Sequence, residues 1–117
     1  FLRQRASGGP LTITGSGINT RDFVFVEDVV AANLSAMDSK KVGKGEVINI
    51  GSGVQKSVNE IAAYFNHPIK YIPPRIEQTN SCADISRAKK LLNWEPNERF
   101  EDGLQKTMEW FEKIRQI

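Results

Sequence analysis

Two arginines stand where the chain is stiff enough to hold a guanidinium group in place. Arg21 follows a polar glycine loop and enters an apolar stretch, and Arg75 follows the pair Pro73-Pro74. Proline fixes its own backbone torsion, and a guanidinium with a buried stem presents a rigid fork of donors to a phosphate. Two such side chains could bind one diphosphate. Spacing alone, however, favours ion pairing of Arg21 with Asp22 or Asp28 and a solvated position for Arg75.

The glycine turns lack the pattern that binds a dinucleotide. That pattern, G-x-G-x-x-G, needs glycine wherever the backbone approaches the pyrophosphate closely. Gly15-Ser16-Gly17 is followed by Thr20 at the third glycine position, and Gly51-Ser52-Gly53 is followed by Lys56. Both segments are therefore predicted to be ordinary turns.

Nucleophilic, acid–base and metal chemistry also find little support. His67 lies in a helix-to-strand turn, where a solvated side chain is expected, and Cys82 has no basic neighbour in sequence, so a small buried hydrophobe is expected. Neither Tyr64 nor Tyr71 has a lysine four residues later. One histidine and one cysteine are too few ligands for a structural zinc site.

The elements that must position the arginines alternate between short strands and helices. A helix end at residues 1–6 is closed by Gly8-Gly9-Pro10 and has no cap before it, so we expect the chain to be cut from a longer one. Ser57 and Glu60 have capping-box spacing, and Asp84 is a candidate cap for a later helix. We expect strands at 11–14, 22–26, 47–50 and 69–72, and further helices beginning near residues 27, 58, 85 and 100.

Composition restricts the class of protein. The 117 residues suit one modest domain, and 16 Lys and Arg against 14 Asp and Glu give a net charge of +2, too small to argue for nucleic acid. No stretch approaches the ~20 apolar residues of a membrane span. Cys82 cannot form an internal disulfide, which favours a reducing, cytoplasmic compartment. The alternation of elements predicts a mixed α/β fold.

The stretch 10–30, PLTITGSGINTRDFVFVEDVV, resembles the C-terminal half of the NAD-dependent nucleotide-sugar epimerase/dehydratase family, the extended short-chain dehydrogenase/reductases. Segments 47–53, 57–61 and 83–96 match the same family in the same order, before an amphipathic final helix. The resemblance covers essentially all 117 residues and is nearest in appearance to the UDP-glucose 4-epimerases. It implies a small C-terminal substrate-binding domain over 1–117, with short strands, about four helices and no Rossmann half.

The resemblance also implies roles for particular residues. In the family, the first half binds NAD and carries a Tyr-x-x-x-Lys catalytic pair, so this stretch is expected to hold no catalytic residue, no cofactor and no metal. It would bind a UDP-sugar, and the complete enzyme would be a homodimer without nucleic-acid or membrane partners. The implied substrate contacts are Arg21 and Arg75 at the diphosphate, Asn49 near the phosphates, and Leu11, Thr12 and Thr14 near the base.

One segment departs from the family pattern. Family members commonly have Arg-Pro-Gly-Asp after the prolines, and that aspartate binds ribose, whereas this chain has Arg75-Ile76-Glu77-Gln78 and a shorter segment before Ala83. Glu77 or Gln78 could take over the ribose contact. The sequence therefore predicts the nucleotide-binding portion of an epimerase, inactive by itself. The alternatives are a non-enzymatic protein- or RNA-binding module and a sequence relic that binds nothing.

Overall fold

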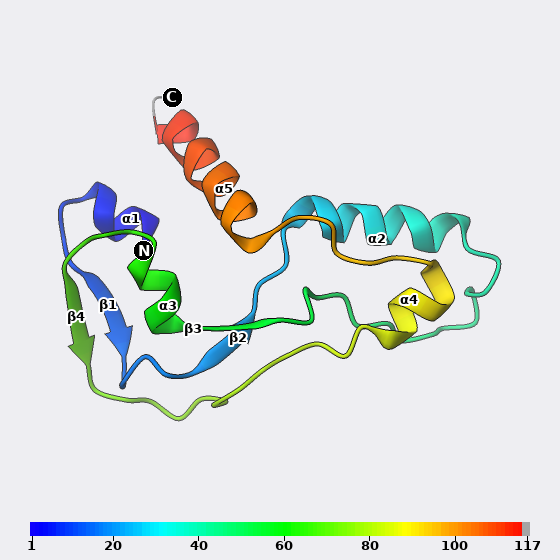
Figure 1. Cartoon of the computed structure of the whole chain (residues 1–117), viewed down its shortest axis with the longest axis horizontal. Coiled ribbons are helices and arrows are strands. Elements are labelled where there is room, and N and C mark those ends of the chain that lie inside the picture. Colours follow the sequence, from blue (N-terminus) through cyan, green and yellow to red (C-terminus); the bar gives the residue numbers. More distant parts are fainter. Residues whose placement is uncertain (116–117) are drawn as a thin grey trace. The chain divides into compact units, whose positions relative to one another are not determined.

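The computed structural model of the chain describes residues 1–115 and has the mixed α/β character that the sequence predicts (Figure 1). Its contacts divide the chain into two compact units, one of Phe1–Arg21 with Gln55–Ser81, the other of Asp22–Val54 with the residues from Cys82 onward. The elements are α1 (Leu2–Ala6), β1 (Leu11–Thr14), β2 (Thr20–Asp22), α2 (Val26–Asp38), β3 (Gln55–Ser57), α3 (Val58–Ala63), β4 (Ile69–Ile72), α4 (Ser86–Leu92) and α5 (Phe100–Arg115).

The first unit is built on a parallel pair of strands, β1 and β4, whose arrows run in the same direction in Figure 1. Leu11 pairs with Ile69 and Thr14 with Ile72. Burial alternates along β1, so that Leu11 and Ile13 are completely enclosed, as the period of two in a strand requires. Parallel strands need a crossover, and α3 lies within it and contacts β1.

The start of α3 confirms the predicted capping box. The Ser57 hydroxyl accepts the backbone N–H of Glu60 at 3.1 Å, and a Glu60 carboxylate oxygen accepts the N–H of Ser57 at 2.6 Å. After α3, Asn66 adopts a left-handed conformation with φ of 43°. The following turn brings His67 Nε2 within 3.0 Å of the Gly9 carbonyl oxygen, so this half-buried histidine links two turns and is not simply solvated.

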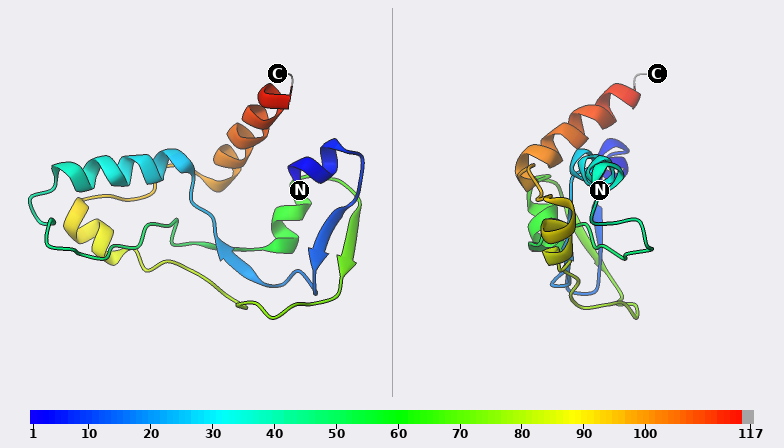
Figure 2. Two further views of the ribbon diagram at one scale, coloured as in Figure 1. Left: turned by 180° about the vertical axis from the view of Figure 1, so that it is seen from behind. Right: turned by 90° about the vertical axis from the view of Figure 1, so that its right-hand side faces the viewer.

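The second unit has an apolar core between α2 and α4, which lie side by side in Figures 1 and 2. Its buried members are Ala32, Ala88, Leu92 and Trp94. The Trp94 indole N–H donates to the Asp28 carbonyl oxygen at 3.0 Å, which satisfies the polar atom of an otherwise enclosed ring.

The predicted strand at 22–26 is wrong. β2 ends at Asp22, residues 23–25 are irregular, and α2 begins at Val26 with Glu27 and Asp28 in its first turn. The aromatic residues of this run pack against the last helix region, because the Phe23 and Phe100 rings meet edge to face at 5.9 Å. The apolar run therefore reflects partial packing against a helix, with Phe23 still 42% exposed, and an apolar run of this length does not distinguish that arrangement from a buried strand.

Three further expectations need correction. Residues 47–50 are irregular, and Ile48 and Ile50 pack against the core of the second unit from this segment without forming a strand. Helix α4 begins after Ile85, so Asp84 accepts the Ser86 N–H at 3.0 Å from one residue too early to be its cap. Cys82 is exposed, because it lies in an irregular connection outside the core.

Two properties of residues 1–115 bear on function. No helix in this range combines the length and the apolar composition that crossing a membrane requires. The same residues contain no group of three or more histidine, cysteine, aspartate or glutamate side chains placed to hold a metal ion.

Candidate functional site

Arg21 and Arg75 converge on one carboxylate in the first unit. Glu77 Oε2 lies 3.6 Å from Arg21 Nη2 and 3.4 Å from Arg75 Nη2. Arg75 Nε approaches the same oxygen at 3.4 Å. The other carboxylate oxygen, Oε1, accepts a hydrogen bond from Asn19 Nδ2 at 3.1 Å. We call Asn19, Arg21, Arg75 and Glu77 the arginine cluster.

The loop between β1 and β2 carries Asn19 and Arg21 to this cluster. Gly17 has φ of +73° and makes a close approach to α3, since a Cβ there would lie 2.1 Å from Asn59 Oδ1. Asn59 holds the loop through its Nδ2, which donates to the Ser16 carbonyl at 2.9 Å, and through its backbone N–H, which donates to Gly17. A fixed loop geometry thus precedes the first arginine.

The segment after β4 carries Arg75 and Glu77 to the same place. The Gly15 N–H donates to the Ile72 carbonyl at 2.9 Å, and Pro74 Cβ lies 3.5 Å from the position of a Cβ on Gly15. Further along, Thr20 N–H donates to Thr79 at 3.0 Å and receives at its own carbonyl the N–H of Ser81 at 3.2 Å. Backbone hydrogen bonds on both sides therefore hold residues 75–81 beside the loop that leads into β2, the strand that carries Arg21.

The two arginines differ in freedom. Arg21 keeps 32% of its side chain exposed, and its Nη1 donates to the Thr20 carbonyl at 2.7 Å. Arg75 keeps 73% exposed, while Glu77 between them keeps 23%. Arg21 is therefore the fixed cation and Arg75 the solvated one. The predicted pairing of Arg21 with Asp22 or Asp28 is wrong, because Arg21 pairs with Glu77.

The other four residues predicted to contact the substrate lie outside the arginine cluster and differ in burial and hydrogen bonding. Leu11 is completely buried in the core of the first unit, and the Thr12 hydroxyl accepts a hydrogen bond from the Gln4 amide, which also accepts the Thr12 N–H at 3.1 Å. Thr14 is half-buried at the end of β1. Asn49 belongs to the second unit, where it is exposed on the irregular segment 47–50. For all four, a role in binding stays a prediction.

The Gly51-Ser52-Gly53 turn already surrounds an anion from the chain itself. Asp22 Oδ1 accepts the Ser52 N–H at 2.7 Å and the Ser52 hydroxyl at 2.6 Å, while Oδ2 accepts the N–H groups of Gly53 and Ala83. Burial raises the pKa of Asp22, but these hydrogen bonds outweigh burial and lower it below its usual range. A turn filled by a carboxylate does not fit a dinucleotide pyrophosphate. Gly15-Ser16-Gly17 does not fit one either, because it leads into β2 and not into a helix.

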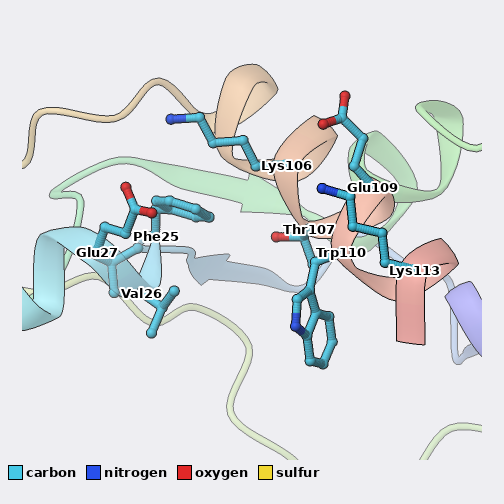
Figure 3. Close-up of a pocket in the computed structure, with 9 residues that line it drawn as sticks. Phe25, Val26, Glu27, Lys106, Thr107, Glu109, Trp110 and Lys113 are labelled. Atoms are coloured by element: carbon cyan, nitrogen blue, oxygen red, sulfur yellow. The ribbon is translucent and has the colours of Figure 1, made fainter. Parts of the chain in front are cut away.

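A hollow of about 700 Å³ in the second unit contains none of the predicted site residues (Figure 3). It lies between the beginning of α2 and the middle of α5, with the Phe25 and Trp110 rings among its walls. One cation of its lining is already paired: Lys106 Nζ lies 2.6 Å from Glu98 and 5.4 Å from the centre of the Phe25 ring. The hydrogen bond to Glu98 raises the pKa of Lys106. Size alone therefore does not make this hollow the better anion site.

The sequence did not indicate Asn19 as a member of the arginine cluster, nor that Glu77 lies between the two arginines. Glu77 stood out only as a possible ribose contact, and nothing in the local sequence marks its carboxylate as the common partner of both arginines. Asn19 is 58 positions from Glu77 along the chain, so no spacing rule connects them. The departure from Arg-Pro-Gly-Asp was the one signal that this segment is unusual.

Comparison with known proteins identifies the class. Residues 1–51 match the sequence profile described as the NAD dependent epimerase/dehydratase family. The UDP-N-acetyl-alpha-D-glucosaminuronate decarboxylase of Bacillus cytotoxicus is 34% identical, over 97% of this chain and 39% of that protein. The chain belongs to the NAD-dependent epimerase/dehydratase family.

Solved structures agree with this assignment. An epimerase from Methanothermobacter thermautotrophicus superposes with a TM-score of 0.92 and 33% identity, over 98% of this chain and 36% of that one. The UDP-glucose 4-epimerase of Thermotoga maritima, solved with UDP-glucose, gives a TM-score of 0.83 and 38% identity, over 97% of this chain and 38% of that one. The chain thus spans less than two fifths of the length of these relatives.

Proposed function

We propose that this chain is the nucleotide-sugar-binding part of an NAD-dependent UDP-sugar epimerase of the UDP-glucose 4-epimerase type, or of a related decarboxylase or dehydratase. Arg21 and Arg75 bind the diphosphate of the substrate. The observation that carries the proposal is their convergence within 3.6 Å of one Glu77 oxygen, because an oxygen anion already lies where both guanidinium groups can reach it. The relative solved with UDP-glucose supports the ligand class.

In this proposal the chain contributes binding energy and orientation. Each charge-assisted contact from Arg21 or Arg75 stabilises the bound nucleotide by about 1.5–3 kcal/mol. Energy gained at the diphosphate, which does not react, restricts the attached sugar to orientations that favour reaction. NAD, bound by residues outside this sequence, supplies the hydride chemistry, since neither glycine turn here fits its pyrophosphate.

The remaining contacts that the family resemblance implies belong to the same proposal. Asn49 is proposed as a phosphate contact, and Leu11, Thr12 and Thr14 are proposed as base contacts, with Leu11 acting through its backbone because its side chain is buried. The complete enzyme is proposed to be a cytoplasmic homodimer. By itself, the chain is proposed to be inactive and to bind UDP weakly, since it spans only 36–39% of its relatives' length.

Calorimetric titration with UDP tests the proposal. Replacing Arg21 or Arg75 by alanine is expected to weaken UDP binding about tenfold or more, the factor that 1.4 kcal/mol represents. Arg99→Ala is the matched control, because Arg99 is 78% exposed and pairs with Glu101 at 3.9 Å in the second unit. Equal affinities of wild type, Arg21→Ala and Arg75→Ala would remove both arginines from the site. Affinity for RNA that falls with salt, without affinity for UDP, would favour the binding-module alternative.

A further inference from the structure

Glu77 occupies the donors that a diphosphate would need. Its Oε2 is shared by Arg21 Nη2 and by Nε and Nη2 of Arg75, at 3.4 to 3.6 Å. Good charge-assisted hydrogen bonds are shorter, about 2.7–2.9 Å. The carboxylate is therefore close enough to neutralise one positive charge, yet it is not tightly bonded to either arginine.

We propose that Glu77 is an internal counter-ion that holds Arg21 and Arg75 together before the ligand binds and competes with the ligand diphosphate for them. This inference rests on the proposed function. It assigns to Glu77 a role opposite to that of a substrate contact: its negative charge lowers affinity for the diphosphate and makes binding an exchange of one anion for another.

The difference in exposure between Arg21 and Arg75 favours such an exchange of anions. Arg75 is 73% exposed, so its guanidinium can leave Glu77 and meet an incoming phosphate from solvent. Arg21 stays in place through its 2.7 Å bond to the Thr20 carbonyl. Asn19 holds the second oxygen of Glu77 at 3.1 Å, which keeps the carboxylate in the cluster after Arg75 has moved. The carboxylate therefore remains a like charge near the bound anion.

A Glu77→Gln variant separates the two possible roles of this residue. Glutamine keeps the length of the side chain and an oxygen for Asn19 but removes the negative charge. A counter-ion role predicts tighter binding of any diphosphate, including inorganic pyrophosphate, which has no ribose. A ribose-binding role predicts weaker UDP binding and no change for pyrophosphate.

The experiment is calorimetric titration of the 117-residue chain with pyrophosphate and with UDP at pH 7 and low salt. For Glu77→Gln we expect both ligands to bind about fivefold tighter, the factor for removing one like charge at contact distance in a water-like medium. Glu95→Gln is the matched control. It makes the same change in net charge at a carboxylate that is 67% exposed and pairs with Lys89 at 2.8 Å, and its affinities should match wild type.

Unchanged pyrophosphate affinity in Glu77→Gln, weaker UDP binding, or an equal gain in Glu95→Gln would each overturn the inference. Circular dichroism and thermal unfolding verify that the variants fold. If Glu77→Gln does not fold, Glu77→Ser, which is also neutral, is judged by the same criteria. The Arg21→Ala variant distinguishes failure of the counter-ion inference from failure of the proposed function. Loss of binding in Arg21→Ala without a gain in Glu77→Gln refutes the counter-ion alone, whereas no effect of Arg21→Ala refutes the proposed function and the counter-ion with it.

Discussion

Ser52 donates both its backbone N–H and its hydroxyl to a single oxygen of Asp22, at 2.7 and 2.6 Å. The other oxygen of Asp22 accepts the N–H groups of Gly53 at 2.9 Å and Ala83 at 3.1 Å. One carboxylate at the end of β2 thus joins the glycine turn 51–53 to the segment that leads into α4. In the second unit, this carboxylate organises the backbone in the way that a bound anion organises a phosphate loop.

Replacing Asp22 by asparagine is expected to destabilise the chain by about 1–3 kcal/mol at pH 7, because an amide NH₂ would face backbone donors. Hydrogen bonds hold the pKa of Asp22 in the folded chain below its usual range, so the stabilising contribution of Asp22 is complete above the usual pKa of an aspartate and disappears as pH falls through the folded pKa. The difference between Asp22→Asn and wild type should therefore shrink below about pH 4.

Urea unfolding between pH 3 and pH 7 measures this difference. Asp38→Asn is the matched control, because Asp38 is an exposed aspartate at the end of α2 and should lose little stability at pH 7. A gap between Asp22→Asn and wild type that stays constant with pH would contradict the role of the ionised carboxylate.

Gly17→Ala is expected to cost more than 3 kcal/mol, because it combines backbone strain with overlap. Gly17 has φ of +73°, and an added Cβ would lie 2.1 Å from Asn59 Oδ1 and 2.9 Å from Ile13 Cγ2. Gly8→Ala is the control, since Gly8 has φ of +75° and nothing within 4 Å of the added atom. It should show only the strain, about 1–2 kcal/mol.

Thermal and urea unfolding of Gly17→Ala and Gly8→Ala measure the loss of stability in each variant. Equal losses of stability would mean that the approach of the loop to Asn59 does not matter. A larger loss in Gly17→Ala is expected to be accompanied by weaker UDP binding, because the same loop leads into β2, which carries Arg21 of the arginine cluster.

Asp28→Ala is expected to lower the free energy of unfolding by about 2–4 kcal/mol. Asp28 is 6% exposed, and its carboxylate accepts the N–H groups of Asn97 and Glu98, both at 3.0 Å. Truncation leaves both donors without this partner next to the buried Trp94. Glu27→Ala, one position earlier on the exposed side of α2, should cost less than about 1 kcal/mol, the size of its interaction with the helix dipole. Similar free energies of unfolding for the two variants in urea would contradict a stabilising role for the hydrogen bonds that Asp28 accepts from Asn97 and Glu98.

Ser57→Ala is expected to cost about 1 kcal/mol, because it removes the side-chain half of the capping box at α3. Ser57→Thr keeps a hydroxyl at the same position and should retain most of the stability. Thermal unfolding of the two variants checks this, and a threonine variant as unstable as the alanine variant would show that the hydroxyl is not the stabilising group.

Patterns within a few neighbouring residues correctly predicted the elements that depend only on such neighbours. The capping spacing of Ser57 and Glu60 predicted the start of α3, the β-branched run predicted β1, and the apolar stripe from Phe100 predicted α5. These features depend on neighbours within a few residues, so the sequence contains their whole explanation. The strand predictions for 22–26 and 47–50 were wrong. An apolar run indicates contact with other apolar groups, but it does not indicate whether a partner strand lies beside it.

For the candidate site, the sequence by itself determined the two stiffly mounted arginines and, through its resemblance, the family to which the chain belongs. Only the tertiary structure decided that Arg21 and Arg75 meet, that Glu77 lies between them, and that Asp22 fills the second glycine turn. The physical reason is that a charge is partnered by whichever group the fold brings within a few ångströms, and loop geometry decides that for residues far apart in the chain.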